Sequence, residues 1–212
     1  MTPARPVVRH ADGTDAEAIT QILARAFQTD PPLMWILPDA DDRPRLSPAF
    51  FRPFVNLVLA DGQVYVTDDH TGAALWLDVD VSVDSAGDNA ELQQALIDGL
   101  GADYAKRFFT LAELFDAEHP AHESHAYLLF VGVVPEVQDQ GIGTAVLLER
   151  LGELDRIHRS AYLEASSERN AALYTRLGFA PIGESVALPD GPTIYPMWRA
   201  PFAAETATRA SF

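Results

Sequence analysis

The stretch that decides the fold covers residues 126–154 and reads AYLLFVGVVPEVQDQGIGTAVLLERLGEL. It opens with a nearly unbroken apolar run, 126–134, which is short enough to be a strand buried on both faces. Apolar residues then recur at helical spacing over 141–154. The loop between the two contains Gly141 and Gly143. Because glycine lets a backbone approach a ligand and a helix N-terminus attracts anions, this unit can hold a pyrophosphate.

The segments after this stretch continue the alternation of strands and helices. A short apolar segment at 161–165 is a strand, parallel to the first if the helix between them is a crossover. A helix is predicted over 170–177, and Gly178 suits its C-terminal cap. Two further strands, 182–188 and 193–198, are joined by a Pro-Asp-Gly-Pro turn and form a closing hairpin.

The segments before it are predicted from the same periodicities. An extended start at 7–9 precedes three helices, a hairpin, a polar loop and two more helices. The helices are expected over 15–27, 33–37, 48–60, 90–100 and 104–117, the hairpin strands over 64–66 and 73–77, and the loop over 78–89.

The composition limits the partners of the protein. The chain has 15 basic and 31 acidic residues, for a formal net charge of −16. A nucleic acid or an anionic membrane requires a clustered basic surface, so this charge balance argues against both as partners. A solvated acidic shell explains most of this charge, although a negative field can also concentrate a cationic amine, an effect that salt would weaken. Without cysteine there is no disulfide, thiolate metal site or cysteine nucleophile.

The length and the chain ends suggest a simple organisation. At 212 residues we expect a single domain over 1–202, followed by a loose tail over 203–212. Residues 1–9 contain no apolar core of a secretory signal. No stretch approaches the roughly 20 apolar residues that span a bilayer. The expected location is the cytoplasm.

The glycine loop has two other interpretations. A dinucleotide-binding fingerprint also places glycines between a strand and a helix, but here Val146 occupies the third glycine position. That fingerprint should also follow the first strand of the fold, whereas this loop comes late in the chain. A tight glycine turn that serves only packing is the other interpretation.

Residues 132–143 resemble the acetyl-CoA-binding segment of the GNAT superfamily of N-acetyltransferases. The family pattern is Gln or Arg, two residues, Gly, one residue, and Gly or Ala. Gln138, Gly141 and Gly143 match it.

A second motif of that family lies downstream. Asn170 and Tyr174 stand four residues apart, just before the Leu-Gly-Phe at 177–179. Two motifs in the right order make the resemblance specific. The layout is most similar to the branch that contains puromycin N-acetyltransferase, with which the chain shares the segments at 26–31 and 163–166 and the closing hairpin.

The resemblance implies a fold and a cofactor site. The fold is α/β (α+β), with a mixed central sheet of six or seven strands flanked by helices and two central parallel strands that splay apart. The pantetheine arm of acetyl-CoA would insert there and pair with the backbone of Val131 and Val133, while Asn170 would hydrogen-bond the arm. The pyrophosphate would lie on the amides of Gln138, Asp139, Gln140, Gly141, Ile142, Gly143 and Thr144.

The resemblance also implies the chemistry. A neutral amine attacks the thioester directly and no metal takes part. The amide near Val133 donates to the carbonyl oxygen. Tyr174 protonates the departing thiolate, which a phenol with a pKa of about 10 can do at neutral pH.

The general base is less defined, because histone-type members carry a glutamate where this chain has Tyr127. Glu164 ranks first, because its strand borders the cleft. Asp30, His122 and His125 are the other candidates, and a solvated or structural role is as open for each of them.

The first half of the chain would form the wall for the acceptor, with Asp30, Trp35, Trp76 and Tyr127 as substrate-binding residues. Phe51 and Phe54 are further candidates for an apolar pocket. For Trp35, Phe51, Phe54 and Trp76 a place in the core is the more common role.

The sequence thus predicts an N-acetyltransferase that moves an acetyl group from acetyl-CoA to a small-molecule amine, as a monomer or homodimer. Two alternatives stay open at this point. One is a module that binds acyl-CoA without catalysis, favoured by the absence of the strand glutamate. The other is a protein or peptide N-acetyltransferase.

Overall fold

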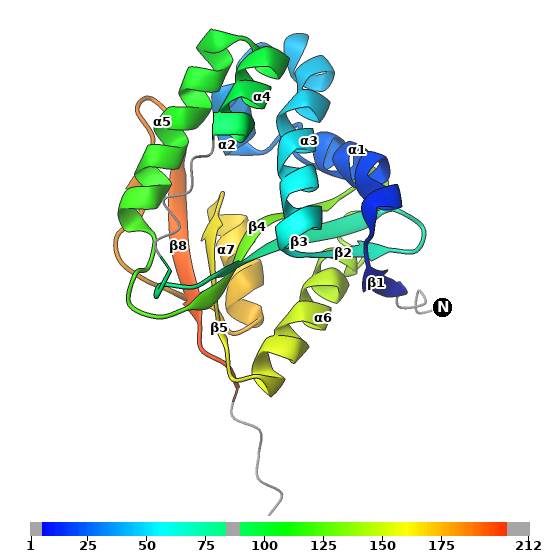
Figure 1. The fold of residues 1–212 in the computed structure, drawn as a ribbon, viewed down its shortest axis with the longest axis vertical. Helices are drawn as coiled ribbons and strands as arrows, with labels where there is room; N and C mark the ends of the chain where they lie inside the picture. Colours follow the sequence, from blue (N-terminus) through cyan, green and yellow to red (C-terminus); the bar gives the residue numbers. More distant parts are fainter. Residues whose placement is uncertain (1–5, 84–89, 203–212) are drawn as a thin grey trace, which may run out of the picture.

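The computed structural model describes residues 6–83 and 90–202. The predicted tail at 203–212 and the end of the predicted 78–89 loop lie outside these residues. The strands are β1 (Val8–His10), β2 (Gln63–Thr67), β3 (Gly72–Val79), β4 (His125–Val133), β5 (Ser160–Ala165), β6 (Ala180–Pro181), β7 (Val186–Ala187) and β8 (Thr193–Arg199). They form one eight-stranded sheet in the order β1-β2-β3-β4-β5-β8-β6, with β7 also paired to β8 (Figure 1).

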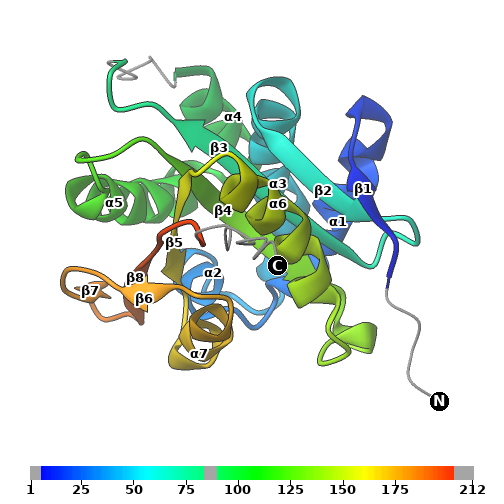
Figure 2. The same cartoon turned by 90° about the horizontal axis from the view of Figure 1, so that it is seen from below.

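Helices cover both faces of this sheet. They are α1 (Ala16–Ala26), α2 (Pro31–Ile36), α3 (Asp42–Asp61), α4 (Ala90–Leu100), α5 (Ala102–Glu118), α6 (Ile142–Arg156) and α7 (Glu168–Arg176). Seen from below, α6 crosses the sheet and α7 lies next to β6 and β8 (Figure 2). No helix among the described residues is both long and apolar enough to cross a membrane.

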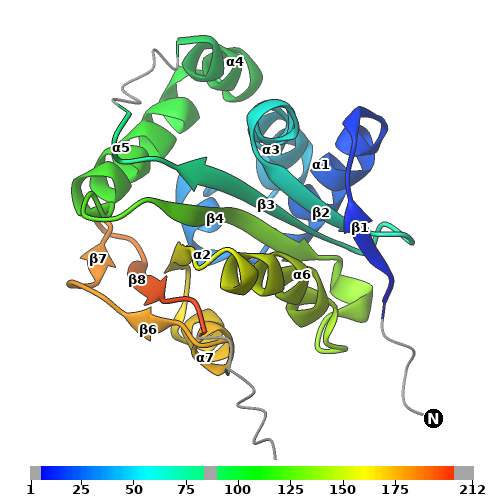
Figure 3. The ribbon, with the colours of Figure 1, turned by 60° about the horizontal axis from the view of Figure 1, so that its bottom comes forward.

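A separate hydrophobic core packs against each face of the sheet. Residues of α1 to α5 pack in one apolar cluster against one face, and α6 packs in a second cluster against the other (Figure 3). Strand β3 shows the division, because Leu75 belongs to the first cluster and Trp76, its neighbour, to the second. Alternate side chains of a strand point to opposite faces, so the period-two pattern of the sequence produces this arrangement.

Helices α2, α3, α5 and α7 begin earlier than their predicted starts, and the first two show why. Helix α2 begins at Pro31, because the Asp30 side chain accepts a hydrogen bond from the Leu33 amide at 3.4 Å and proline suits a first helical turn. Helix α3 begins at Asp42 and contains Pro48 within it. Pro53 also lies inside this helix, and each internal proline costs roughly 3 kcal/mol, which the burial of the phenylalanine-rich face of α3 offsets.

The closing hairpin also differs from the prediction. The segment 182–188 is not one strand; β6 and β7 lie on either side of a break opposite Pro196 of β8. Proline has no amide hydrogen to donate to an edge strand. The Pro196 carbonyl still accepts a hydrogen bond from the Ile182 amide at 3.0 Å. This division gives the sheet eight strands instead of six or seven.

Candidate active site

The two central parallel strands separate after a short paired region. Residues 125–127 of β4 pair with 160–162 of β5, and the remaining residues of these fully described strands do not pair with each other. A bulge in β4 between the partners of Leu75 and Trp76 turns the strand at this point. A cleft of about 740 Å³, here called the strand cleft, opens between the separated strands. Much of β4 is therefore only half-buried, and the prediction of burial on both faces is wrong for its second half.

The far end of the strand cleft is formed by the glycine loop. Gly141 has a φ of 82° and Asp139 one of 61°, both in the left-handed region. The first helical hydrogen bond of α6 runs from the Ala145 amide to the Gly141 carbonyl at 2.9 Å. The amides of Ile142, Gly143 and Thr144 therefore have no acceptor within the helix and can bind an anion.

The backbone of β4 faces the strand cleft at alternate residues. The Val134 amide donates to the Thr71 carbonyl at 2.9 Å, on the β3 side. Since backbone groups alternate along a strand, those of Val133 and Val131 point to the cleft side. The Gln138 side chain donates to the Val133 carbonyl at 3.0 Å and so links the loop to the end of β4.

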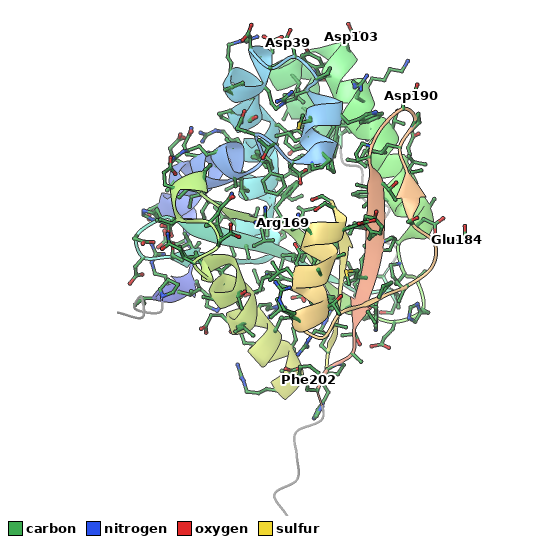
Figure 4. All side chains as sticks on the ribbon, turned by 180° about the vertical axis from the view of Figure 1, so that it is seen from behind. Asp39, Asp103, Arg169, Glu184, Asp190 and Phe202 are labelled. Carbon is green, nitrogen blue, oxygen red and sulfur yellow. The ribbon has the colours of Figure 1, made fainter. Side chains whose placement is uncertain are left out.

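Of the predicted cofactor residues, all except Gln140 line the strand cleft. Gln140 is exposed at the tip of the loop. Asn170 lies at the cleft and donates to the Ser166 hydroxyl at 2.9 Å. It does not cap α7, because the Ser167 hydroxyl accepts from the Asn170 amide at 3.2 Å and takes that role. Arg169 pairs with Asp139 at 2.8 Å at the exposed start of α7 (Figure 4).

A second cavity of about 610 Å³, here called the phenylalanine cleft, lies between the sheet and helices α2 to α5. Five residues line both clefts, so the two cavities meet at them: Phe27, Asp30, Leu129, Phe130 and Glu164. Two carboxyl groups therefore stand at the junction. Tyr127, another predicted residue, lines the phenylalanine cleft next to them.

Glu164 is the most unusual group at this junction. Its side chain is 4% exposed, and no described residue hydrogen-bonds its buried Oε1 atom. Burial raises its pKa to about 7, although the phenols of Tyr127 and Tyr162 favour the charged form and offset part of the rise. A buried carboxyl that has one oxygen without a hydrogen-bond partner and a pKa near neutrality is well suited to accept a proton.

Two further titratable groups that line the strand cleft, Asp30 and Tyr174, also have raised pKa values. Burial raises the pKa of Asp30 to about 6, opposed by hydrogen bonds from Ser166 and the Leu33 amide. Burial, together with the charge of Asp30, raises the pKa of Tyr174 well above its ordinary value. Tyr174 lines the strand cleft and is suited to donate a proton.

His119, at the C-terminal end of α5, was not predicted from the sequence. Its Nδ1 atom lies 4.0 Å from Glu164 Oε1, longer than a hydrogen bond, and its ring meets the rings of Tyr127 and Tyr162 edge-on. Burial lowers its pKa to about 4, so its ring is neutral at pH 7. No spacing in the sequence connects the end of this helix with β5, so only the fold identifies this neighbour.

The two histidines predicted as candidate bases, His122 and His125, line neither cleft. His125 is fully buried, with Nε2 3.0 Å from Nε2 of His119 and Nδ1 2.8 Å from the Glu123 carbonyl. His122 is exposed and packs on the ring of Trp198. Among the described residues, no group of three His, Asp or Glu side chains is arranged to hold a metal.

The prediction that Trp35 and Trp76 form the acceptor wall is wrong, because neither residue lines a cleft. Trp76 is fully buried in the core on the α6 face, because its place on β3 points it away from the phenylalanine cleft. Trp35 lines neither cleft, since it donates to the Pro189 carbonyl at 3.0 Å and packs under Arg107. Phe51 is core, and Phe54 borders the phenylalanine cleft.

The chain is similar to known acetyltransferases in sequence and in fold. Residues 102–179 match the family model described as "Acetyltransferase (GNAT) family". The structure of a histone acetyltransferase HPA2 and related acetyltransferase from Corynebacterium glutamicum ATCC 13032 is similar at a TM-score of 0.69 and 26% identity, over 95% of this chain and 99% of that one.

Two further structures share the fold at lower identity. An agmatine N-acetyltransferase mutant has a TM-score of 0.62 at 17% identity, over 93% of this chain and 100% of that one. Arylalkylamine N-acetyltransferase 2 from Aedes aegypti has a TM-score of 0.61 at 15% identity, over 93% and 99%.

Proposed function

We propose that the chain is an acetyltransferase of the GNAT family, whose family model matches residues 102–179, and that it transfers an acetyl group from acetyl-CoA to the amine of a small molecule by direct attack. The observation that carries this proposal is the junction of the two clefts, where the Glu164 side chain is buried and its Oε1 atom has no hydrogen-bond partner among the described residues. Neighbours of the same fold named for agmatine and for arylalkylamines support an amine acceptor.

The strand cleft fits coenzyme A. The free amides of Ile142, Gly143 and Thr144 at the start of α6 would hold the pyrophosphate, a local attraction that a chain of charge −16 can still provide. The backbone of Val131 and Val133 would pair with the pantetheine amides, since this side of β4 lacks a strand partner. Bound acetyl-CoA supplies the activated acetyl group as a thioester.

Glu164 accepts the proton of the acceptor amine. An ammonium ion cannot attack, so a base must produce the neutral amine before or during attack. A carboxylate in an apolar setting is a stronger base than one in water, and a pKa of about 7 allows it to be charged for part of the time at neutral pH. Asp30 lies at the same junction and adds a second acidic group toward an incoming cation.

Tyr174 delivers the second proton. The C–N bond forms as the C–S bond breaks, and the phenol donates its proton to the departing sulfur. Its raised pKa keeps the donor protonated at every pH at which the base works. The acid Tyr174 lines the strand cleft, and the base Glu164 lines both clefts where they meet.

Two measurements on the whole chain test this function. Titration of coenzyme A by calorimetry should show saturable binding, and incubation with acetyl-CoA and a panel of amines should release free CoA. Binding without release for any amine would instead support a non-catalytic acyl-CoA-binding module. Acetylated peptides in mass spectrometry, with no acetylated small amine, would support a protein acetyltransferase.

A further inference from the structure

The lining of the phenylalanine cleft is dominated by large apolar side chains, and this composition restricts what can enter. Its aromatic members come from α3, α5, β4 and the turn after α1: Phe27, Phe50, Phe54, Phe108, Phe109, Phe115, Tyr127 and Phe130. Several of them meet at steep angles, with the Phe108 ring centroid 5.4 Å from those of Phe50 and Phe54, and Phe54 at 5.4 Å from Phe130. Edge-to-face rings of this kind offer both faces and edges to a further ring.

The charges of this cleft are all of one sign. Among the described residues that line it there is no Lys, Arg or His, whereas it has carboxyl groups at two places. Asp30 and Glu164 lie at the inner end, where it meets the strand cleft. Glu113 and Asp116 are exposed on α5. A cation is therefore favoured at the inner end of the cleft. The lining between this end and the exposed carboxylates of α5 is mostly apolar.

A second cationic group on the same ligand would gain little binding free energy in the phenylalanine cleft. The exposed carboxylates of Glu113 and Asp116 interact in water, where an ion pair contributes at most about 1 kcal/mol. An ammonium or guanidinium placed among the phenylalanines would lose its hydration without a partner. Apolar rings lose nothing of this kind and gain from burial.

From these observations we propose that the acceptor is a primary monoamine on an apolar, ring-bearing body, an arylalkylamine in chemical class, with its ring in the phenylalanine cleft and its amine at Glu164. This inference rests on the proposed function, because it places the acceptor in the cleft from which the base acts. The volume of about 610 Å³ is in the range of small-molecule sites and exceeds the needs of a bare methylene chain.

The test compares 2-phenylethylamine with agmatine and 1,8-diaminooctane. Their kcat/KM values are measured in the release of CoA, and their affinities by calorimetry with coenzyme A present. We expect 2-phenylethylamine to exceed both dications by about 10-fold or more in each measurement. Equal or better performance of either dication would overturn the inference and leave the proposed function intact. If no amine releases CoA, the proposed function fails, and the affinities still decide which ligand the cleft prefers.

A pair of variants locates the ring. Phe109 is only partly buried and touches just one other ring in the cluster, Phe108, so Phe109→Ala should fold. It should weaken binding of 2-phenylethylamine about 5-fold or more while the affinity for coenzyme A stays constant. Phe202→Ala is the control, because Phe202 is 58% exposed and lies at the opposite end of the molecule from Asp103 at the start of α5 (Figure 4). An equal effect of both variants, or no effect of Phe109→Ala, would contradict this placement.

Discussion

The two clefts of the protein are built in different ways. Half of the residues that line the strand cleft are close in sequence, from β4 through the glycine loop to α6, and this half carries the free backbone amides; the other half come from the turn after α1, β5 and α7. The phenylalanine cleft is formed by side chains from α2 to α5 and the central strands. A backbone site suits a ligand that many proteins share, whereas a side-chain site can change its ligand by substitution. The difference indicates where specificity resides.

The largest expected effect comes from the junction that both clefts share. Glu164→Gln should lower kcat/KM for the amine about 10³-fold, because the base is lost, and leave the affinity for coenzyme A unchanged. Steady-state kinetics and calorimetry measure the two quantities. Glu184→Gln is the control, since Glu184 is exposed on the edge of the molecule (Figure 4). A small loss of kcat/KM would assign the base to Asp30.

The same substitution should make the folded protein more stable at high pH. Because the folded pKa of Glu164, about 7, lies above the ordinary 4.5, its charged form costs stability as pH rises through this window. The gain of Glu164→Gln should be near zero at pH 4 and reach at most about 3 kcal/mol above pH 7. Denaturant unfolding of both proteins at pH 5 and pH 8 measures it. A gain independent of pH would contradict the raised pKa.

The next effect is confined to the strand cleft. Tyr174→Phe should lower kcat about 10²-fold by removing the acid while the affinity for coenzyme A stays within about 2-fold. Tyr104→Phe removes a hydroxyl outside both clefts and should act like the parent protein. Full activity of Tyr174→Phe across the pH range would exclude this tyrosine as the acid.

A backbone change in the glycine loop should have a smaller effect, which is limited to the strand cleft. Gly141→Val places a branched side chain at a φ of 82°, which costs about 1–2 kcal/mol and should weaken binding of coenzyme A about 10-fold. The KM for the amine at saturating acetyl-CoA should not change. Gly152→Ala is the matched control, because an added Cβ there meets nothing within 4 Å. Equal effects of the two variants would contradict a specific role for the loop.

The smallest effect on the maximal rate concerns His119. His119→Ala should admit water beside Glu164, lower the pKa of that carboxyl and move the acidic limb of the pH–rate profile from about 7 by roughly one unit. The rate at high pH should change only a few-fold. His122→Ala, at an exposed histidine outside both clefts, should leave the limb in place. An unmoved limb in His119→Ala would show that His119 does not control the burial of Glu164.

The sequence alone determined the order of most elements and the position of the glycine loop. Helical and alternating periodicities depend on neighbouring residues, so α1, α4, β2 and β3 match their predictions closely. The loop from Gln138 to Thr144 was also predictable, because its glycines and the amides after them act through the local backbone. Predictions failed where distant residues decide, as for the break opposite Pro196 and the place of Trp76 in the acceptor wall, where its alternative role in the core is the one observed.

Only the tertiary structure determined the chemistry of the junction. Nothing near Glu164 in the sequence raises its pKa; α5 brings His119 to it and β4 brings Tyr127, and together they exclude water. The phenylalanine cleft likewise exists only once separate helices face the bulged strand. Periodicity and backbone conformation are local properties that a sequence specifies directly, whereas burial and the pKa values it sets depend on contacts between segments far apart in the chain.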